Sequence, residues 1–122
     1  MAATLDAPVR VWLKVDSGMH RLGIYPHEFD ELYQCLSQSS NVQGPLRLMS
    51  HFASSDELDK PATVNQLALF QQITQDSTGE HSLANSGAVL NWPQSHGDWV
   101  RPGLMLYGVS PMADAVGADH GL

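Results

Sequence analysis

Four short apolar segments alternate with three helical patterns along this 122-residue chain. The segments with strand character are residues 9–15, 46–52, 81–84 and 99–107, the last containing the turn dipeptide Pro102-Gly103. Residues 9–15 are apolar on both faces apart from Arg10 and Lys14, which is typical of a strand buried on both sides. Strands that alternate with helices form βαβ units around a parallel sheet. The sequence therefore predicts an α/β fold.

The helical patterns lie between the predicted strands. The first opens at Pro26, which suits a first helical turn. Its apolar residues follow i, i+3, i+4, i+7 spacing and are Phe29, Leu32, Tyr33 and Leu36. The second opens at Pro61, and its apolar residues step by three at Val64, Leu67, Phe70 and Ile73. A shorter helix is expected to begin near Ser86.

The number of predicted strands and helices matches about half of a β/α barrel. A complete eight-stranded β/α barrel takes about 250 residues, and four strands with three helices are roughly half of one. We therefore expect a partial (β/α)8 TIM-type barrel with about four parallel strands and intervening helices. Residues 1–8 are a lead-in, residues 9–110 the half barrel, and residues 111–122 a polar tail of small residues.

The charge pattern argues against several partners. The formal net charge is -7, and the basic residues are scattered, whereas a nucleic-acid binder needs a basic stripe. The six basic residues are Arg10, Lys14, Arg21, Arg47, Lys60 and Arg101. The longest apolar runs are far shorter than the roughly 20 residues of a membrane helix, and the first residues lack the features of a secretory signal. We expect neither nucleic acid nor a membrane as a partner.

Cysteine and histidine usage gives two further expectations. Cys35 is the only cysteine, which excludes an internal disulfide or a Cys-based zinc cluster and fits a reducing cytoplasm. The histidines lack the spacing of zinc ligands. We therefore expect a cytoplasmic protein without a metal site.

Polar residues gather where the predicted strands end, in the loops that carry the chemistry of β/α folds. Lys14 lies on the opposite strand face from Leu13 and Val15, because successive side chains alternate. An unpaired lysine inside a barrel is costly, so it needs an anion or a lowered pKa. His51 stands at the end of the second strand, where both a structural and a catalytic role are open.

The two later loops contain donors suited to phosphate. Asn85 and Ser86 end the third strand and start a helix, whose free N–H groups attract an anion, although both residues are also ordinary N-caps. Arg101 stands beside a turn in which Gly103 and Leu104 could offer free N–H groups. Late barrel strands often share a phosphate site of this kind.

Four segments together resemble the alanine racemase family, in the family's order and at about its spacing. They are Leu-Lys-Val-Asp-Ser-Gly-Met-His-Arg-Leu-Gly (13–23), Ser-His-Phe-Ala-Ser-Ser-Asp-Glu (50–57), Asn-Ser-Gly-Ala (85–88) and Trp-Val-Arg-Pro-Gly-Leu-Met-Leu-Tyr-Gly (99–108). A full family member has a pyridoxal-phosphate barrel followed by a β-rich domain and works as a dimer. The resemblance implies that this chain is the second half of the barrel domain. Residues 111–122 would then begin the hinge toward a missing C-terminal β domain.

The resemblance also implies roles for individual residues. Arg101 matches the arginine that faces the pyridine nitrogen of pyridoxal phosphate, and His51 matches a histidine that tunes this arginine. Arg21 matches the arginine that reaches the cofactor phenolate and the substrate carboxylate. Lys14 matches a lysine that is often carbamylated, and the carbamate would supply negative charge beside Arg21. The positions implied for binding the cofactor, mainly its phosphate, are Asn85, Ser86, Gly103 and Leu104.

The resemblance implies interconversion of L- and D-alanine, which supplies D-alanine for cell-wall peptidoglycan. Two groups that this reaction needs in the family have no counterpart in this sequence. The lysine that forms the Schiff base lies on the family's first barrel strand, and neither Lys14 nor Lys60 stands in that context. The catalytic tyrosine comes from the β domain of the other subunit, and the chain offers no plausible replacement. Its tyrosines are Tyr25, Tyr33 and Tyr107. We therefore expect the isolated chain to be inactive, and its binding of pyridoxal phosphate stays open.

Other interpretations stay open at this point. The chain could be a non-catalytic module that binds phosphate-bearing ligands or assembles with copies of itself, because four strands leave two open sheet edges. It could also be a piece of a single-barrel pyridoxal-phosphate-binding protein related to the racemases. We expect a small amino acid as the substrate of the complete enzyme, and a homo-oligomer formed through the exposed sheet edges.

Overall fold

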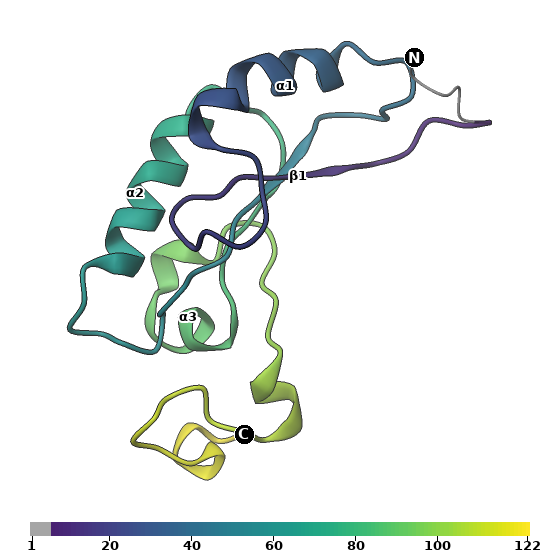
Figure 1. Ribbon diagram of the computed structural model, residues 1–122. Coiled ribbons are helices and arrows are strands. Elements are labelled where there is room, and N and C mark those ends of the chain that lie inside the picture. The colour runs from purple at the N-terminus through teal and green to yellow at the C-terminus, as the bar shows by residue number, and fades with distance from the viewer. Residues whose placement is uncertain (1–5) are drawn as a thin grey trace.

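The computed structural model describes residues 6–122 as alternating short strands and helices (Figure 1). The first five residues of the predicted lead-in lie outside the described part. The strands are β1 (Trp12–Lys14), β2 (Arg47–Met49) and β3 (His81–Ser82). The α-helices are α1 (Phe29–Ser37), α2 (Ala62–Thr74) and α3 (Ser86–Asn91). Four 3₁₀ helices cover Pro26–Glu28, Pro93–Ser95, Leu104–Tyr107 and Gly117–His120.

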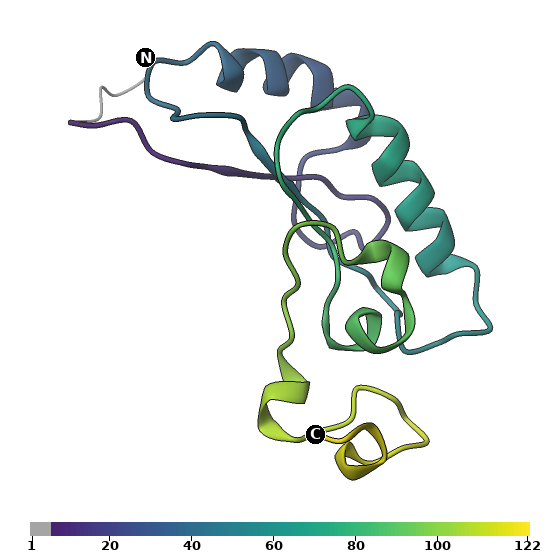
Figure 2. The same ribbon diagram turned by 180° about the vertical axis from the view of Figure 1, so that it is seen from behind.

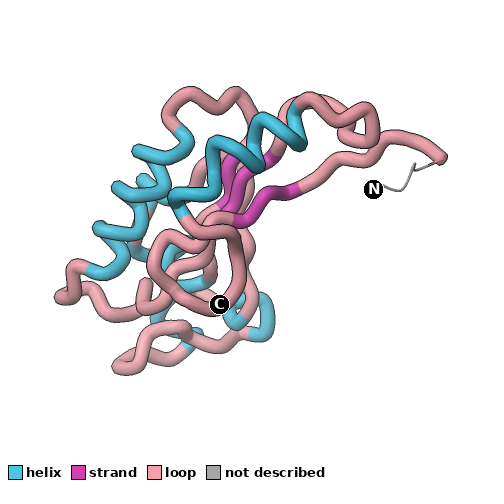
Figure 3. Tube along the Cα trace, turned by 45° about the horizontal axis from the view of Figure 1, so that its top comes forward, coloured by secondary structure: helices cyan, strands magenta, loops and turns pink. Residues whose placement is uncertain are grey.

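The three strands form one parallel sheet in the order β1-β2-β3. Leu13 of β1 pairs with Leu48 of β2, which in turn pairs with His81 of β3. Figure 3 shows the strands side by side, with the connecting helices outside them. Each connection between parallel strands contains a helix, as a βαβ unit requires. The predicted α/β fold with parallel strands is therefore confirmed.

The core lies between the sheet and helices α1 and α2, which cover the same face of the sheet (Figures 1 and 2). Leu48 from the sheet and Phe70 from α2 are at most 1% exposed. Burying side chains of this size stabilises the fold by about 2 kcal/mol each. Strand side chains alternate between faces, so Trp12 and Lys14 of β1 lie on the opposite face, which no helix within residues 6–122 covers (Figures 1 and 2).

The predicted fourth strand at residues 99–107 is wrong for most of its length. Trp99 forms a single parallel bridge with Ser82, and the Arg101 N–H donates to the Ala84 carbonyl. Pro102 has no N–H to continue the ladder, and the chain then turns into the 3₁₀ helix Leu104–Tyr107. Tyr107 is 84% exposed rather than part of a strand. The sheet has three strands, with residues 99–101 running beside β3.

The predicted apolar stripe of α2 also needs correction. A step of three residues turns a helix by about 300°, so Val64 and Ile73 lie on opposite sides, and Val64 is 51% exposed. The buried residues instead follow the i, i+3, i+4, i+7 pattern of a helix packed on one face. They are Thr63, Gln66, Leu67, Phe70 and Thr74.

The C-terminal segment lies apart from the sheet. Figure 1 shows the yellow end of the chain below α3, away from the strands. Gly117 packs there against the backbone of Gly108, where a Cβ atom would approach the Gly108 carbonyl oxygen to 1.9 Å. In residues 6–122, none of the helices has both the length and the apolar character needed to cross a bilayer.

Candidate functional site

Arg101 lies at the carboxyl ends of the strands and is held by groups from two of them. Its Nη1 donates to Ser82 Oγ at 2.5 Å, and its Nη2 donates to the Ser50 carbonyl at 2.6 Å. A longer bond of 3.3 Å reaches the Leu83 carbonyl. Because a guanidinium has five donors in a rigid fork, these acceptors fix its plane while leaving other donors for a ligand.

His51 lies against this guanidinium. Arg101 Nη2 is 3.4 Å from His51 Nδ1, and an arginine can only donate, so Nδ1 is the acceptor and the ring is neutral. Burial, together with the charges of Arg101, Arg21 and Lys14, lowers the pKa of His51 below its ordinary value. The structure therefore places a neutral imidazole beside a permanent cation.

The depressed histidine pKa values predict a pH dependence of stability. The unfolded chain protonates His51 near pH 6.5, whereas the folded chain does so only at lower pH. The unfolded state thus binds more protons in this window, so the free energy of unfolding should fall as pH drops from about 7.5 to about 5.5. Urea unfolding at the two values measures the difference. His81, whose pKa burial also lowers, acts in the same direction.

The matched variants are His51→Gln and His81→Gln. Each should reduce the pH dependence, and the double variant should nearly remove it over this range. A double variant with the full wild-type dependence would contradict the assignment to these two rings.

Lys14 and Arg21 add positive charge to the same end of the sheet. Burial lowers the pKa of Lys14, and Arg21 and Arg101 lower it further, whereas Asp16 opposes the shift. The Asp16 carboxylate is already engaged, because its Oδ1 accepts the backbone N–H groups of residues 18, 19 and 20 at 3.0 Å each. These hydrogen bonds hold the pKa of Asp16 low despite its burial. The cluster therefore suits an anionic ligand.

The loop that carries Arg21 is closed on itself. Ile24 N–H donates to the Lys14 carbonyl, and Asp16 N–H donates to the Ile24 carbonyl, both at 2.9 Å. Gly23 permits this turn with a φ of 135°, where a Cβ would lie 2.7 Å from the Asp16 nitrogen. Arg21 consequently lines a small cavity of about 160 Å³ beside Asp16.

The start of α3 faces a second and larger cavity. Ser86 Oγ accepts the Gly103 N–H at 2.8 Å and lies 3.5 Å from the Met105 nitrogen. Asn85 is the N-cap of α3, and its Oδ1 accepts the Ala88 N–H at 3.2 Å and the Ser55 hydroxyl at 2.6 Å. The cavity measures about 360 Å³. It is lined by His51, Ser55, Asp56, Asn85, Ser86, Gly87, Arg101, Gly103, Leu104 and Pro111.

This arrangement brings most of the sequence-predicted residues to one place. Asn85 and Ser86 share the 360 Å³ cavity with Arg101, while Lys14 and Arg21 act on the same cluster through their charge. The Met105 N–H joins that of Gly103 in donating to Ser86 Oγ, and Leu104 lines the same cavity.

Comparison with known proteins then decides the family. The family model described as "Alanine racemase, N-terminal domain" matches residues 1–111. The chain belongs to the alanine racemase family. The resemblance indicated by the four sequence segments is thereby confirmed.

Relatives of known sequence and structure agree with this assignment. The chain is 53% identical over 121 residues to the alanine racemase of Shewanella amazonensis, covering 99% of this chain and 33% of that protein. It matches the crystal structure of the biosynthetic alanine racemase from Pseudomonas aeruginosa with a TM-score of 0.91 and 48% identity, over 97% of this chain and 33% of that one. The chain thus spans about a third of the length of these racemases.

A second similar structure was solved with a bound cofactor. The alanine racemase from Bartonella henselae, described with covalently bound pyridoxal phosphate, matches with a TM-score of 0.71 and 31% identity. The match covers 81% of this chain and 29% of that one.

Gln66 is an important residue near the site that the sequence analysis missed. It is buried on α2, and its Oε1 accepts the Ala53 N–H at 2.9 Å. Its Nε2 donates to the His51 carbonyl at 3.0 Å and reaches Ser17 Oγ at 3.5 Å. One amide therefore joins the loops that follow β1 and β2. The only sequence signal was a long polar side chain at a position that the helical period places beside Leu67 and Phe70.

The Gln66→Leu variant should lower the free energy of unfolding by about 2 kcal/mol, because it leaves the partly buried Ala53 N–H and His51 carbonyl without their partners. Urea unfolding followed by tryptophan fluorescence measures this loss. Gln71→Leu is the matched control, since Gln71 is exposed on the same helix. Equal stability of the two variants would show that the Gln66 hydrogen bonds do not hold the loops together.

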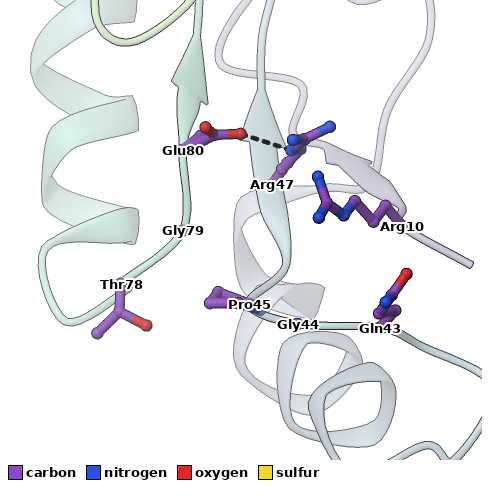
Figure 4. A pocket seen from close by; sticks show the side chains of 8 residues that line it. All are labelled: Arg10, Gln43, Gly44, Pro45, Arg47, Thr78, Gly79 and Glu80. Atoms are coloured by element: carbon purple, nitrogen blue, oxygen red, sulfur yellow. Dashed lines mark ion pairs between the residues drawn. The ribbon is translucent and has the colours of Figure 1, made fainter.

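A cavity of about 410 Å³ lies at the other end of the strands. Figure 4 shows the Arg47–Glu80 ion pair that joins β2 to the residue before β3, and Arg47 Nε lies 2.6 Å from Glu80 Oε2. Arg10 lines the same cavity. Because β/α folds carry their chemistry at the carboxyl ends of the strands, we assign this end to stability.

Proposed function

We propose that this chain is the second half of the pyridoxal-phosphate barrel of an alanine racemase, a cytoplasmic isomerase that interconverts L- and D-alanine and supplies D-alanine for peptidoglycan. The observation that carries this proposal is that Arg101 and Ser86 line the same cavity at the carboxyl ends of the strands. Both residues lie in segments that resemble the family, and the fold matches racemase structures.

The donors of the cavity fit pyridoxal phosphate. Ser86 Oγ acts as an acceptor toward the Gly103 N–H, so its own O–H remains available to a phosphate oxygen. Gly103 and Leu104 line the same cavity, and α3 begins there with its N–H groups. When bound, pyridoxal phosphate supplies an electron sink for proton removal from an amino acid.

Arg101 would set the strength of that sink. A guanidinium keeps its proton, so Arg101 would leave the facing pyridine nitrogen unprotonated. Compared with an acidic partner, Arg101 would therefore weaken the electron withdrawal that bound pyridoxal phosphate supplies, which would favour racemisation over transamination.

Arg21 and Lys14 would form the part of the site that binds the substrate carboxylate. Arg21 can bind a carboxylate through two parallel hydrogen bonds. The lowered pKa of Lys14 increases the fraction of neutral amine, which is the form that adds carbon dioxide to give a carbamate and a proton. A carbamate on Lys14 would place one negative charge beside Arg21 and orient it.

This chain would not catalyse the reaction alone. Lys60 is exposed and ion-paired with Glu57, and Lys14 belongs to the cationic cluster, so neither replaces the lysine that forms the Schiff base. The exposed Tyr107 and Tyr25 face solvent. We propose that the lysine and the tyrosine come from the remainder of the racemase.

A composite enzyme tests the proposal. In it, this chain replaces the matching third of the Shewanella amazonensis racemase, and conversion of L- to D-alanine is followed by circular dichroism. We expect the composite to racemise alanine at a rate within about tenfold of the parent enzyme, which corresponds to a barrier difference of at most about 1.4 kcal/mol. We expect no racemisation by the isolated chain. A folded composite that holds pyridoxal phosphate but does not racemise alanine would reject the proposed function.

A further inference from the structure

Two buried serines lie next to the cationic cluster, one in the loop after β1 and the other at the end of β2. Ser17 is 4% exposed and Ser50 is 2% exposed, and their hydroxyl oxygens lie 2.7 Å apart. Burying a hydroxyl is costly unless it is hydrogen-bonded. Two buried hydroxyls in contact therefore need a consistent set of donors and acceptors around them.

The direction of each hydrogen bond follows from the partners of the two serines. Ser50 Oγ donates its single proton to the Val15 carbonyl at 2.8 Å, so Ser17 must be the donor in the bond between the two hydroxyls. Ser17 Oγ can then accept from Gln66 Nε2, which lies at 3.5 Å. The Gln66 amide cannot be reversed, because its Oε1 already faces a backbone N–H and its Nε2 a backbone carbonyl. One directed chain of hydrogen bonds therefore runs from Gln66 through Ser17 and Ser50 to Val15.

This chain of hydrogen bonds connects the segments that hold two arginines. Ser17 belongs to the loop that carries Arg21, and the Asp16 carboxylate fixes that loop internally through three backbone N–H groups. Ser50 accepts Arg101 Nη2 on its backbone carbonyl at 2.6 Å. The bond between the two hydroxyls thus links the Arg21 loop directly to the residue that holds Arg101.

Packing supports the same link from the side of α2. A Cβ at position 18 would lie 3.1 Å from Gln66 Cγ, so the loop lies in close contact with the Gln66 side chain. Apolar contacts of this kind are non-directional, whereas a hydrogen bond restricts both distance and angle. The buried hydroxyls therefore define the position of the loop more narrowly than packing alone would.

We propose that Ser17 and Ser50 are positioning residues, whose paired hydroxyls hold Arg21 at a fixed distance and angle from Arg101. Neither serine lines the cavity of either arginine, so each would act through an arginine and not on the substrate. In the proposed racemase, the separation of the two arginines would set where the substrate carboxylate lies relative to the cofactor ring. This consequence rests on the proposed function, whereas the hydrogen-bonded link rests on this chain alone.

Kinetics of the composite racemase give the first test. Ser17→Ala removes the donor to Ser50 but leaves the bond from Ser50 to the Val15 carbonyl in place, so the fold should be retained. We expect KM for alanine to rise at least about fivefold with kcat within about twofold, because a misplaced Arg21 weakens binding of the ground state and the transition state alike. Ser17→Thr keeps the hydroxyl and should bring KM back to within about twofold of the unchanged composite.

Ser95→Ala is the matched control. Ser95 is 1% exposed, and its hydroxyl donates to the Trp92 carbonyl at 2.7 Å. The control therefore also loses one buried hydroxyl bond, but a bond that stays within one turn of the chain, and KM should not change. If Ser17→Ala does not fold, Ser17→Cys takes its place, since a thiol has a similar shape but is only a weak donor.

The chain without cofactor gives an independent test. Burial and the charge of Arg101 lower the pKa of His51, so titration of the His51 ring, followed by NMR, reports the position of the guanidinium. Ser17 lies on a different loop from His51. Ser17→Ala should nevertheless raise the pKa of His51 toward its ordinary value, because Ser50 and the Arg101 guanidinium that it holds become free to shift. Ser95→Ala should leave this pKa unchanged.

Either test can overturn the inference. An active composite in which Ser17→Ala leaves KM unchanged would do so, as would an unchanged pKa of His51 in that variant. Equal rises in KM for Ser17→Ala and Ser17→Thr would assign the effect to packing and would also reject the role of the hydroxyl. A composite that is inactive before any substitution would count against the proposed function only, and the NMR titration would then decide the inference.

Discussion

The Gly79→Ala variant is expected to lose about 3 kcal/mol of unfolding free energy, close to the upper end for overpacking. A Cβ at position 79 would lie 1.7 Å from the carbonyl oxygen of Leu46 and 2.7 Å from its carbonyl carbon. Both atoms belong to the backbone that enters β2, and Leu46 is only 1% exposed. Relief of the clash therefore requires the strand itself to move. Urea or thermal unfolding followed by far-ultraviolet circular dichroism measures the loss.

Gly103→Ala is the matched control. A Cβ there would meet only Ser86 Oγ at 4.0 Å, which is an ordinary contact, so the change in stability should stay within about 0.5 kcal/mol. If Gly79→Ala were as stable as this control, the close approach of residue 79 to β2 would be wrong.

The second large effect is expected for Arg101→Leu in the composite racemase. Leucine cannot donate to Ser82, Ser50 or the cofactor, so we expect kcat/KM to fall by at least about 100-fold, or roughly 2.7 kcal/mol of transition-state stabilisation. Arg101→Lys keeps the charge but loses the planar fork. Its kcat/KM should therefore lie between that of the unchanged composite enzyme and that of Arg101→Leu. Racemisation rates measured with saturating pyridoxal phosphate, together with absorbance to determine cofactor occupancy, separate a catalytic loss from a binding loss.

The control for this experiment is Arg10→Leu. Arg10 is an exposed arginine that lines the cavity at the opposite ends of the strands, so its replacement should leave racemisation unchanged. Arg101→Leu with near-normal kcat/KM would remove Arg101 from the proposed mechanism.

The hydrophobic pattern of the sequence predicted the first strands correctly, but it predicted the last strand wrongly. Residues 9–15 are apolar on both faces apart from Arg10 and Lys14, as expected of a parallel strand, and β1 and β2 pair in the sheet. The segment after Trp99 also contains apolar residues, but Pro102 removes the donor that a ladder needs. Turn chemistry therefore overrode strand propensity there. On α2, the three-residue step of Val64, Leu67, Phe70 and Ile73 predicts one apolar face, but such a step rotates around the helix.

The site was predictable only for residues that stand in recognisable motifs. Arg101 and Ser86 could be named because their neighbours in sequence form a strand end and a helix start. The acceptors that fix Arg101 could not, since Ser50 lies 51 residues away in sequence and Ser82 lies 19 residues away. Such contacts depend on the register between strands. The same holds for Gln66, whose partners lie on two different loops.

The closed loop between Asp16 and Ile24 has a consequence for ligand affinity. Ordering a flexible backbone costs roughly 1–2 kcal/mol for each residue, and a binding loop that is mobile before binding incurs that cost on association. Here the Asp16 side chain and the Ile24 bridge fix the loop through contacts within the chain. The Arg21 segment is therefore preorganised, and an anion reaching it would lose little affinity to loop ordering.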